Sequence, residues 1–252
     1  MRILLTNDDG IDSEGLLALR GALSALAETI VIAPDHNWSA AGHTKTMHKP
    51  LRVTRVKMRD GQEGYACDGT PSDCVAMGML GLAGEPPSLV VSGINKGANL
   101  GGDVTYSGTV AAAMEGVING IPGIAISLAS RHEWDFSVAA GFAARLTSQL
   151  IEQGMDREVL LNVNVPSLPR EQVKGVLVTR LGKRIYRDKL IERQDPFGRS
   201  YYWIGGEEPS GHAEEGTDIW ALANGYVSVT PIQMDLTDYA LLERLKSWGL
   251  SL

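Results

Sequence analysis

Two adjacent carboxylates, Asp8 and Asp9, are the pair of side chains near the start of the chain most suited to chemistry. They lie in the segment Asn7–Gly10, which follows the apolar run Ile3–Leu5. Adjacent carboxylates repel each other unless positive charge lies between them, and a divalent cation supplies that charge best. Two interpretations follow: a metal site, or one Asp that caps a helix beside one that is solvated.

The flanking residues predict that this pair lies on a turn between a strand and a helix. Ile3–Leu5 is a short apolar run of the kind found in buried parallel strands. Asp12 or Ser13 can cap the helix that should follow. Ligands of open α/β sheets bind beyond the carboxyl ends of strands, so we expect this turn to face a ligand. The helix is indicated by apolar residues at helical spacing: Leu16, Leu19, Leu23 and Leu26.

A second polar stretch, Ser92–Thr109, is rich in Gly, Asn and Asp and should form a loop after the buried strand Ser88–Val91. Ser107, Gly108 and Thr109 begin the helix that follows, where free backbone N–H groups and the positive helix end can bind an anion. A helix cap is the alternative role for the two hydroxyls, and both roles can hold together. The glycine patterns of a P-loop or a dinucleotide-binding turn are absent, which argues against a nicotinamide-dependent enzyme.

The loop after the strand Thr29–Pro34 also leaves a carboxyl end and could lie beside the first turn. His36, His43 and His48 superficially resemble a metal cluster. Their spacing matches no helical metal pair, and a site led by carboxylates suits hard metals better than zinc. We therefore expect at least two of the three to be hydrogen-bonding residues of the loop. Trp38 is interpreted as a core or loop anchor rather than a base-stacking platform.

Strands and helices alternate up to about residue 180, which predicts a Rossmann-like, doubly wound, mostly parallel α/β sheet. A terminal helix is expected from about Asp238 to Trp248. The predicted parts are a catalytic core over residues 1–180 and a C-terminal portion over residues 181–252, which we expect to serve oligomerisation.

The C-terminal portion should carry a projecting β-hairpin over about residues 182–205. The segment is basic and aromatic, and Asp195–Gly198 is a strong turn within it. An acidic loop, Gly205–Thr217, is expected to follow. A basic, aromatic hairpin could bind nucleic acid, but in an acidic chain a subunit contact or an active-site rim is favoured.

The composition is that of an ordinary globular protein: 252 residues, 44% hydrophobic and 21% charged. The net charge of −7 argues against binding to nucleic acid, although a metal could still attract a phosphorylated substrate. Cys67 and Cys74 have the spacing of neither a zinc site nor a redox pair, so two free thiols are expected. No membrane span or signal peptide is recognisable, and we expect a cytoplasmic protein without membrane partners.

With these stretches in view, the chain resembles the SurE family, the stationary-phase survival protein E nucleotidases. The motifs run in order over about the first half of the chain, and their combination is far more specific than any one of them. They are Leu4–Gly10, Ala33–Asp35 with Trp38–Ser39, Asp68–Cys74, Ser92–Asn99 and Tyr106–Val110.

The resemblance implies a divalent-metal-dependent phosphatase that acts on nucleoside monophosphates. This is 5'-nucleotidase activity, with 3'-nucleotidase and short-chain exopolyphosphatase activities in some members. It also implies homodimers or homotetramers that exchange C-terminal elements, and one Mg²⁺ or Mn²⁺ per subunit. Oxygen ligands suit both metals, and Asp8 and Asp9 count as catalytic because they bind the cation. Carried to matching positions, the metal ligands are Asp8, Asp9, Ser39 and Asn95.

The expected reaction is single-step hydrolysis, in which a metal-activated water attacks the phosphoryl group. An aspartyl-phosphate through Asp8 or Asp9 is less favoured, because both carboxylates are committed to the metal. Lys96 could add positive charge or could be a solvated surface residue. The alternative function is a non-catalytic nucleotide-binding or assembly protein that uses the same loops. Amide, hydroxyl and backbone N–H groups should hold the phosphate, from Asn99, Ser107, Gly108 and Thr109.

Overall fold

A computed structural model describes residues 1–130, 132–154, 156–212 and 214–251 of the chain. The strands are β1 (Arg2–Thr6), β2 (Glu28–Pro34), β3 (Val53–Lys57), β4 (Glu63–Cys67), β5 (Leu89–Lys96), β6 (Gly123–Ala129), β7 (Leu160–Pro166), β8 (Val176–Val178), β9 (Arg184–Gln194), β10 (Ser200–Gly211) and β11 (Val227–Pro231). The helices are α1 (Glu14–Leu23), α2 (Pro71–Met79), α3 (Gly108–Ile118), α4 (Ser137–Gln153), α5 (Asp218–Ala223) and α6 (Tyr239–Lys246), with short 3₁₀ turns η1 (Gly101–Thr105) and η2 (Arg170–Gln172).

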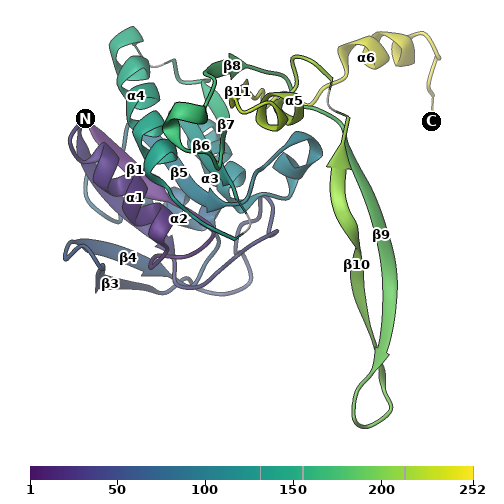
Figure 1. The fold of residues 1–252 in the computed structure, drawn as a ribbon, viewed down its shortest axis with the longest axis horizontal. Helices are drawn as coiled ribbons and strands as arrows, with labels where there is room; N and C mark the ends of the chain where they lie inside the picture. Colours follow the sequence, from purple (N-terminus) through teal and green to yellow (C-terminus); the bar gives the residue numbers. More distant parts are fainter. Residues whose placement is uncertain (131, 155, 213, 252) are drawn as a thin grey trace.

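The body is one sheet with strand order β3-β4-β2-β1-β5-β6-β7-β11-β8 and helices on both faces (Figure 1). Pairing is parallel from β4 to β7 and antiparallel for β3 with β4 and for β11 with β7. The predicted Rossmann-like, doubly wound, mostly parallel sheet is therefore confirmed. Because β11 lies between β7 and β8, the C-terminal portion supplies a strand to the body. The domain boundary at residue 180 stays a prediction.

The core explains why the strands are apolar along their whole length. Ile3 and Leu5 of β1 pack with α1 and α4 on one face of the sheet. Leu4, between them, packs with α2 on the other face. Successive side chains of a strand point to opposite faces, so a strand covered on both sides reads as an unbroken apolar run.

Helix caps fix where the helices begin and therefore where the loops end. Ser13 caps α1 by accepting a hydrogen bond from Leu16 N–H, which decides between the two predicted candidates. Thr70 and Asp73 form a capping box at α2, with Pro71 in its first turn. Within the described residues, no helix combines the length and the apolarity needed to cross a membrane.

The predicted loops Ser92–Thr109 and Gly205–Thr217 are both wrong in part, because the first residues of each belong to a strand. β5 continues through Lys96 instead of ending at Val91, since Asn95 and Lys96 pair with β6 after a shift in register. The shift passes through Gly93, where a Cβ would lie 2.3 Å from the Ile126 carbonyl oxygen. Gly and polar residues there favoured a loop in the sequence, but pairing with a neighbouring strand overrides that local preference.

The hairpin is longer than predicted. β9 and β10 pair around the predicted turn Asp195–Gly198, and β10 runs to Gly211 instead of ending near residue 205. Glu207, which was expected in that loop, lies opposite Arg187 in the hairpin and forms an ion pair with it at 3.2 Å. The hairpin projects from the body as an arm, and α6 lies beyond α5 at the far end of the molecule (Figure 1).

Candidate active site

A cavity of about 270 Å³ lies where the predicted turn and loops meet at the carboxyl edge of the sheet. The turn after β1, the loop after β2, the end of β5 and the segment from η1 to α3 all contribute to it. The polar residues that line it are Asp8, Ser39, Asn95, Lys96, Asn99, Asp103, Tyr106 and Ser107. Three of the four predicted metal ligands and three of the five predicted phosphate-binding residues therefore share one cavity.

Asp8 is the most buried carboxylate of this cavity, with 4% of its surface exposed. Burial raises the pKa of Asp8 to about 6, against a lowering by the hydrogen bond that Thr109 Oγ1 donates to Oδ1 at 2.6 Å. Among the described residues, no lysine or arginine pairs with it. A buried carboxylate without a cationic partner is costly to ionise, so the site favours a bound cation.

Asp9 lies beside the cavity rather than on its wall. Its Oδ2 accepts from Lys96 N–H at 3.2 Å, and its Oδ1 accepts from Asn37 Nδ2 at 3.4 Å. Burial raises the pKa of Asp9, and these contacts with Lys96 lower it. Each oxygen keeps a lone pair beyond its one hydrogen bond, which leaves the carboxylate able to bind a metal.

Ser39 and Asn95 bring neutral oxygens to the same cavity. Asn95 donates from Nδ2 to the Gly97 carbonyl at 2.9 Å, which orients its side chain. Ser39 is held through its backbone, whose N–H donates to Asn37 Oδ1 at 2.7 Å. Carboxylate, hydroxyl and amide oxygens are the donor set that Mg²⁺ and Mn²⁺ prefer, so the residues present fit such a cation.

The start of α3 reaches the cavity through Ser107. Its Oγ caps α3 by accepting from Val110 N–H at 3.1 Å. Gly108 packs directly behind Asp8, where a Cβ would lie 2.8 Å from that residue's Cβ. Gly108 and Thr109 are absent from the cavity wall and contact Asp8 instead.

Asn99 is tied to β6 and β7 by hydrogen bonds to residues far from it in the sequence. Its N–H donates to Asn164 Oδ1 and its Nδ2 donates to Ser127 Oγ, both at 2.8 Å. Asn162 and Asn164 return hydrogen bonds to its carbonyl. Two asparagines at alternate positions of an otherwise apolar strand were the available signal, because buried amides require partners.

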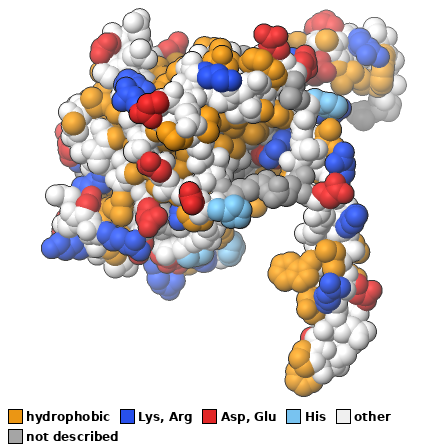
Figure 2. All heavy atoms as spheres, in the orientation of Figure 1, with side chains coloured by type: hydrophobic (Ala, Val, Ile, Leu, Met, Phe, Trp, Pro, Cys, Tyr) orange, Lys and Arg blue, Asp and Glu red, His pale blue; other side chains and the backbone are white. Residues whose placement is uncertain are grey.

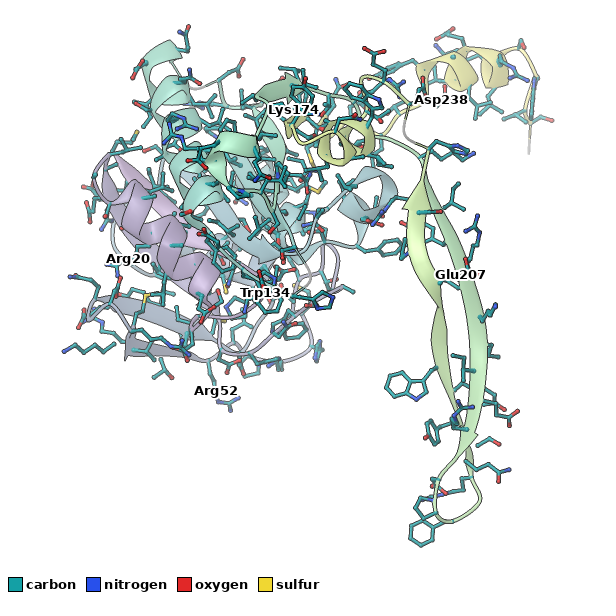
Figure 3. All side chains as sticks on the ribbon, in the orientation of Figure 1. Arg20, Arg52, Trp134, Lys174, Glu207 and Asp238 are labelled. Carbon is teal, nitrogen blue, oxygen red and sulfur yellow. The ribbon has the colours of Figure 1, made fainter. Side chains whose placement is uncertain are left out.

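Asp103 and Tyr106 also line the cavity and were missed in the sequence analysis. They lie just before α3, where the sequence analysis considered only the hydroxyl groups of Ser107 and Thr109 and the backbone of Gly108. The ammonium group of Lys96 lies over the ring of Trp134, 4.5 Å from its centre. Figure 3 labels Trp134. This contact holds the Lys96 side chain beside the cavity and gives it more order than a free surface lysine.

The loop histidines form hydrogen bonds, as predicted for at least two of them. His43 Nε2 lies 3.0 Å from Glu115 Oε2, and His36 Nδ1 contacts the Asp35 carboxylate. Trp38 is half-buried, and its backbone N–H donates to the Asp8 carbonyl at 2.8 Å, as expected for a loop anchor.

The chain is similar in sequence and in structure to known proteins. The family model described as "Survival protein SurE" matches residues 3–188. The 5'-nucleotidase SurE of Chloroflexus aggregans is 54% identical over 98% of this chain and 99% of its own length. The protein of the same name from Herpetosiphon aurantiacus is 52% identical over 98% of each chain. The crystal structure of the Sure protein from Aquifex aeolicus superposes with a TM-score of 0.84 at 46% identity, covering 98% of this chain and 99% of that one.

Proposed function

This chain belongs to the SurE family, and on that premise we propose that it is a 5'-nucleotidase, an enzyme that hydrolyses nucleoside monophosphates to nucleoside and phosphate. The observation that carries the proposal is the cavity in which the buried carboxylate of Asp8 faces the N-terminal end of α3. The carboxylate of Asp8 can bind a cation, and the positive N-terminal end of α3 can bind a phosphate, so this cavity can hold both at once.

We expect Asp8, Asp9, Ser39 and Asn95 to hold one Mg²⁺ or Mn²⁺ per subunit. When bound, the cation supplies positive charge that activates water and withdraws charge from the phosphoryl oxygens. The raised pKa of Asp8 and the hard oxygens of the four side chains support this assignment.

The chain's own residues bind and orient the substrate phosphate. Ser107, at the start of α3, faces the phosphate oxygens from the cavity wall, and Lys96 adds a positive charge. Asn99 can donate with the amide hydrogen that Ser127 does not take. Thr109 and Gly108 act on Asp8, one by a hydrogen bond and the other by leaving room for its side chain.

The proposal extends to 3'-nucleoside monophosphates and short polyphosphate. The residues assigned above contact only the phosphate group, so they do not by themselves demand the 5' position. A substrate series separates these activities, because each compound presents the same phosphate on a different leaving group.

We propose that the protein works as a homodimer or homotetramer. α6 has eight residues and none of them is buried, although a helix this short is unstable in water without packing. Figure 2 shows hydrophobic side chains exposed along the arm, where Phe197 and Ile204 are 83% and 82% exposed. A second copy of the chain would cover both surfaces.

The predicted cytoplasmic location is supported by Cys67 and Cys74, both buried as free thiols. The net charge of −7 supports a small phosphorylated substrate over nucleic acid.

The function is tested by phosphate release from AMP, GMP, their 3' isomers and tripolyphosphate, each with EDTA, Mg²⁺ or Mn²⁺. We expect release from the 5'-monophosphates that requires the metal. Absence of release under every condition would reject the enzyme. Nucleotide binding that survives EDTA, without release, would instead favour a binding or assembly protein.

A further inference from the structure

A buried carboxylate, Asp218, joins the arm to the segment that leads into the cavity. Asp218 is the first residue of α5 and is 0% exposed. Its Oδ2 accepts from Gly101 N–H of η1, and its Oδ1 accepts from Gly182 N–H, both at 2.7 Å. Gly182 opens the segment Gly182–Tyr186, which we call the arm root because the arm grows from it. One side chain thus binds the backbones of both segments.

A second carboxylate joins the same two segments in the opposite direction. Asp103 of η1 accepts at Oδ2 from Nε and Nη2 of Arg184, each at 2.7 Å. Its Oδ1 accepts from the hydroxyl of Tyr186. A two-pronged contact with a guanidinium fixes direction as well as distance, so η1 cannot rotate freely on the arm root. The hydrogen bond to Asp103 raises the pKa of Tyr186 to about 12, which keeps that donor protonated.

The backbones of the two segments also touch. Gly101 has φ +51°, and a Cβ there would lie 2.3 Å from the Gly182 carbonyl oxygen. A Cβ on Gly182 would in turn lie 2.8 Å from Ile219 Cδ1 and 3.0 Å from Asp218 Oδ1. Only glycine allows the backbone approach at position 101, and Gly182 is packed closely against α5, so the contact is a close-packed junction.

The junction ends where the predicted phosphate site begins. η1 runs directly into Tyr106 and Ser107, and Asp103, Tyr106 and Ser107 all line the cavity. Arg184, Tyr186 and Asp218 do not line it. Any movement of η1 relative to the arm root therefore displaces the start of α3, although the arm residues themselves never touch the cavity.

We infer that Asp218 and Arg184 are positioning residues, which hold η1 on the arm root and thereby set the place of Ser107 and the affinity for the substrate phosphate. This inference rests on the proposed function and deepens it. The arm then serves the active site as well as subunit contact, because its root holds η1, the segment that continues into Ser107.

The test compares two arginines on the same strand. Arg184→Gln removes the contact with Asp103. Arg187 lies three residues further along β9, and Arg187→Gln removes only its exposed ion pair with Glu207 of β10. We expect Arg184→Gln to speed amide hydrogen exchange over residues 101–107 and to lower kcat/KM about ten- to hundredfold, mostly through KM. Arg187→Gln should match the wild type in both readouts. Arg184→Lys, which keeps the charge, should restore part of the lost affinity.

A second pair separates this role from general destabilisation of α5. Asp218→Asn places an amide against two backbone donors, whereas Thr217→Ala removes the cap of the same helix without touching η1. Only Asp218→Asn should raise KM. Equal exchange rates and equal KM for Arg184→Gln and Arg187→Gln would overturn the inference, as would faster exchange with unchanged KM. Lack of phosphate release by the wild type would reject the proposed function, and the hydrogen-exchange comparison would still test the junction.

Discussion

At the scale of single residues, the surroundings of Asp8 set what the site can do. Its carboxylate is almost fully buried and receives one strong hydrogen bond, from Thr109. That bond offsets part of the cost of burial, and the pKa of about 6 shows that the cost is not fully met. A bound cation would meet the remainder, which is why a polar and partly unsatisfied cavity is suited to metal binding.

Thr109→Val tests this arrangement, because it keeps the shape of the side chain and removes the donor to Asp8. We expect metal affinity and kcat/KM to fall about 10- to 100-fold, as when a residue that orients a metal ligand is lost. Thr109→Ser keeps the hydroxyl and should stay within a few-fold of the wild type. Titration calorimetry with Mn²⁺ measures the affinity, and equal affinity for both variants would contradict the assigned role.

At the scale of elements, the loop that carries Ser39 is fastened to the two helices beneath it. Glu115 of α3 is buried and pairs with Lys45 at 2.7 Å and with His43 at 3.0 Å. Asp73 of α2 accepts from the N–H and the hydroxyl of Thr46, at 3.0 and 2.6 Å. These contacts add to the backbone hydrogen bonds of Trp38 and Ser39 in fixing the loop that carries Ser39.

The loop attachment predicts a pH-dependent stability. Burial alone would raise the pKa of Glu115, but the hydrogen bonds from His43, Lys45 and Asn119 outweigh it and hold this pKa below the ordinary value of 4.5. An acid whose pKa is lowered by folding stabilises the protein above its unfolded pKa, and this contribution is lost as the pH falls below about 4.5.

Glu115→Gln should therefore lower the free energy of unfolding by about 1–3 kcal/mol at pH 7. The difference from the wild type should shrink between pH 5 and pH 3, because the wild-type carboxyl is then protonated. Urea unfolding at each pH measures this difference in the free energy of unfolding. The control is Glu243→Gln, because Glu243 forms only an exposed ion pair with Lys246. A difference that stays constant with pH would contradict the assigned ion pairs.

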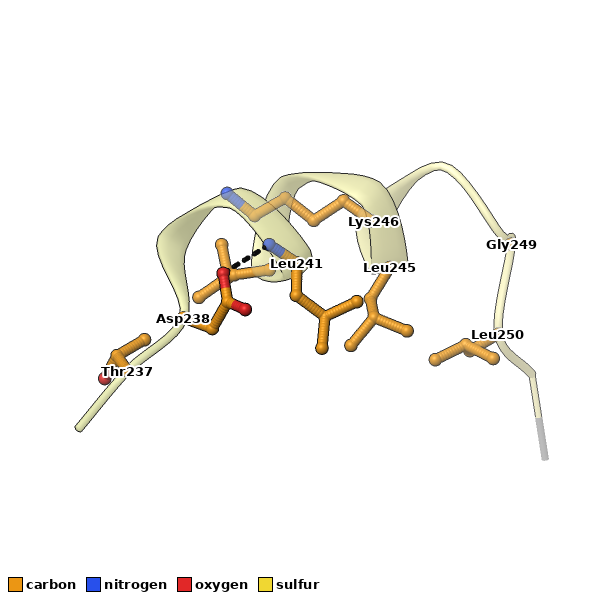
Figure 4. A pocket seen from close by; sticks show the side chains of 8 residues that line it. Thr237, Asp238, Leu241, Leu245, Lys246, Gly249 and Leu250 are labelled. Atoms are coloured by element: carbon orange, nitrogen blue, oxygen red, sulfur yellow. Dashed lines mark hydrogen bonds between the residues drawn. The ribbon is translucent and has the colours of Figure 1, made fainter. Parts of the chain in front are cut away.

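At the scale of the whole molecule, α6 and the arm expose apolar side chains that no other part of the described chain covers. Figure 4 shows Leu241, Leu245 and Leu250 on one side of α6 and the residues after it, where they line an open groove. Residues four apart on a helix share a face, so Leu241 and Leu245 form a continuous apolar strip along this groove. A subunit contact there would bury the strip and hold α6 in its helical form.

The double variant Leu241→Glu, Leu245→Glu should break that contact. We expect the wild type to sediment as a dimer or tetramer of its 27.1 kDa chain, and the variant to sediment as a smaller species. Glu243→Gln in the same helix serves as the control and should keep the wild-type mass. Sedimentation velocity decides the point, and a wild-type monomer at assay concentration would contradict the proposed assembly.

Local patterns were sufficient to predict the sheet class, the capped helices and the turn of the arm. The apolar run of β1 and the cap of α1 at Ser13 are each recognisable within a few residues of sequence. The continuation of β5 through Asn95 was hidden, because its polar residues gain strand structure only by pairing with β6. Strand pairing is a long-range property, and local composition does not report it.

The same distinction divides the site residues. Asp8 and Ser107 were found because they lie in short polar segments beside apolar ones. Asn164 reaches Asn99 from a distant strand, and Arg184 reaches Asp103 from the arm, so neither pairing has a local signal. Sequence therefore marked the residues at strand ends, while the network that supports them required the folded chain.

The proposed nucleotidase activity depends on a metal held around Asp8. Phosphate release from 5'-AMP over a range of Mn²⁺ concentrations tests it most directly, with Asp8→Asn beside the neighbouring exposed control Asp12→Asn. We expect release to rise with Mn²⁺ and saturate in the wild type and in Asp12→Asn, and to fall to background in a folded Asp8→Asn. Release that persists in EDTA, or that Asp8→Asn retains at the wild-type rate, would contradict it.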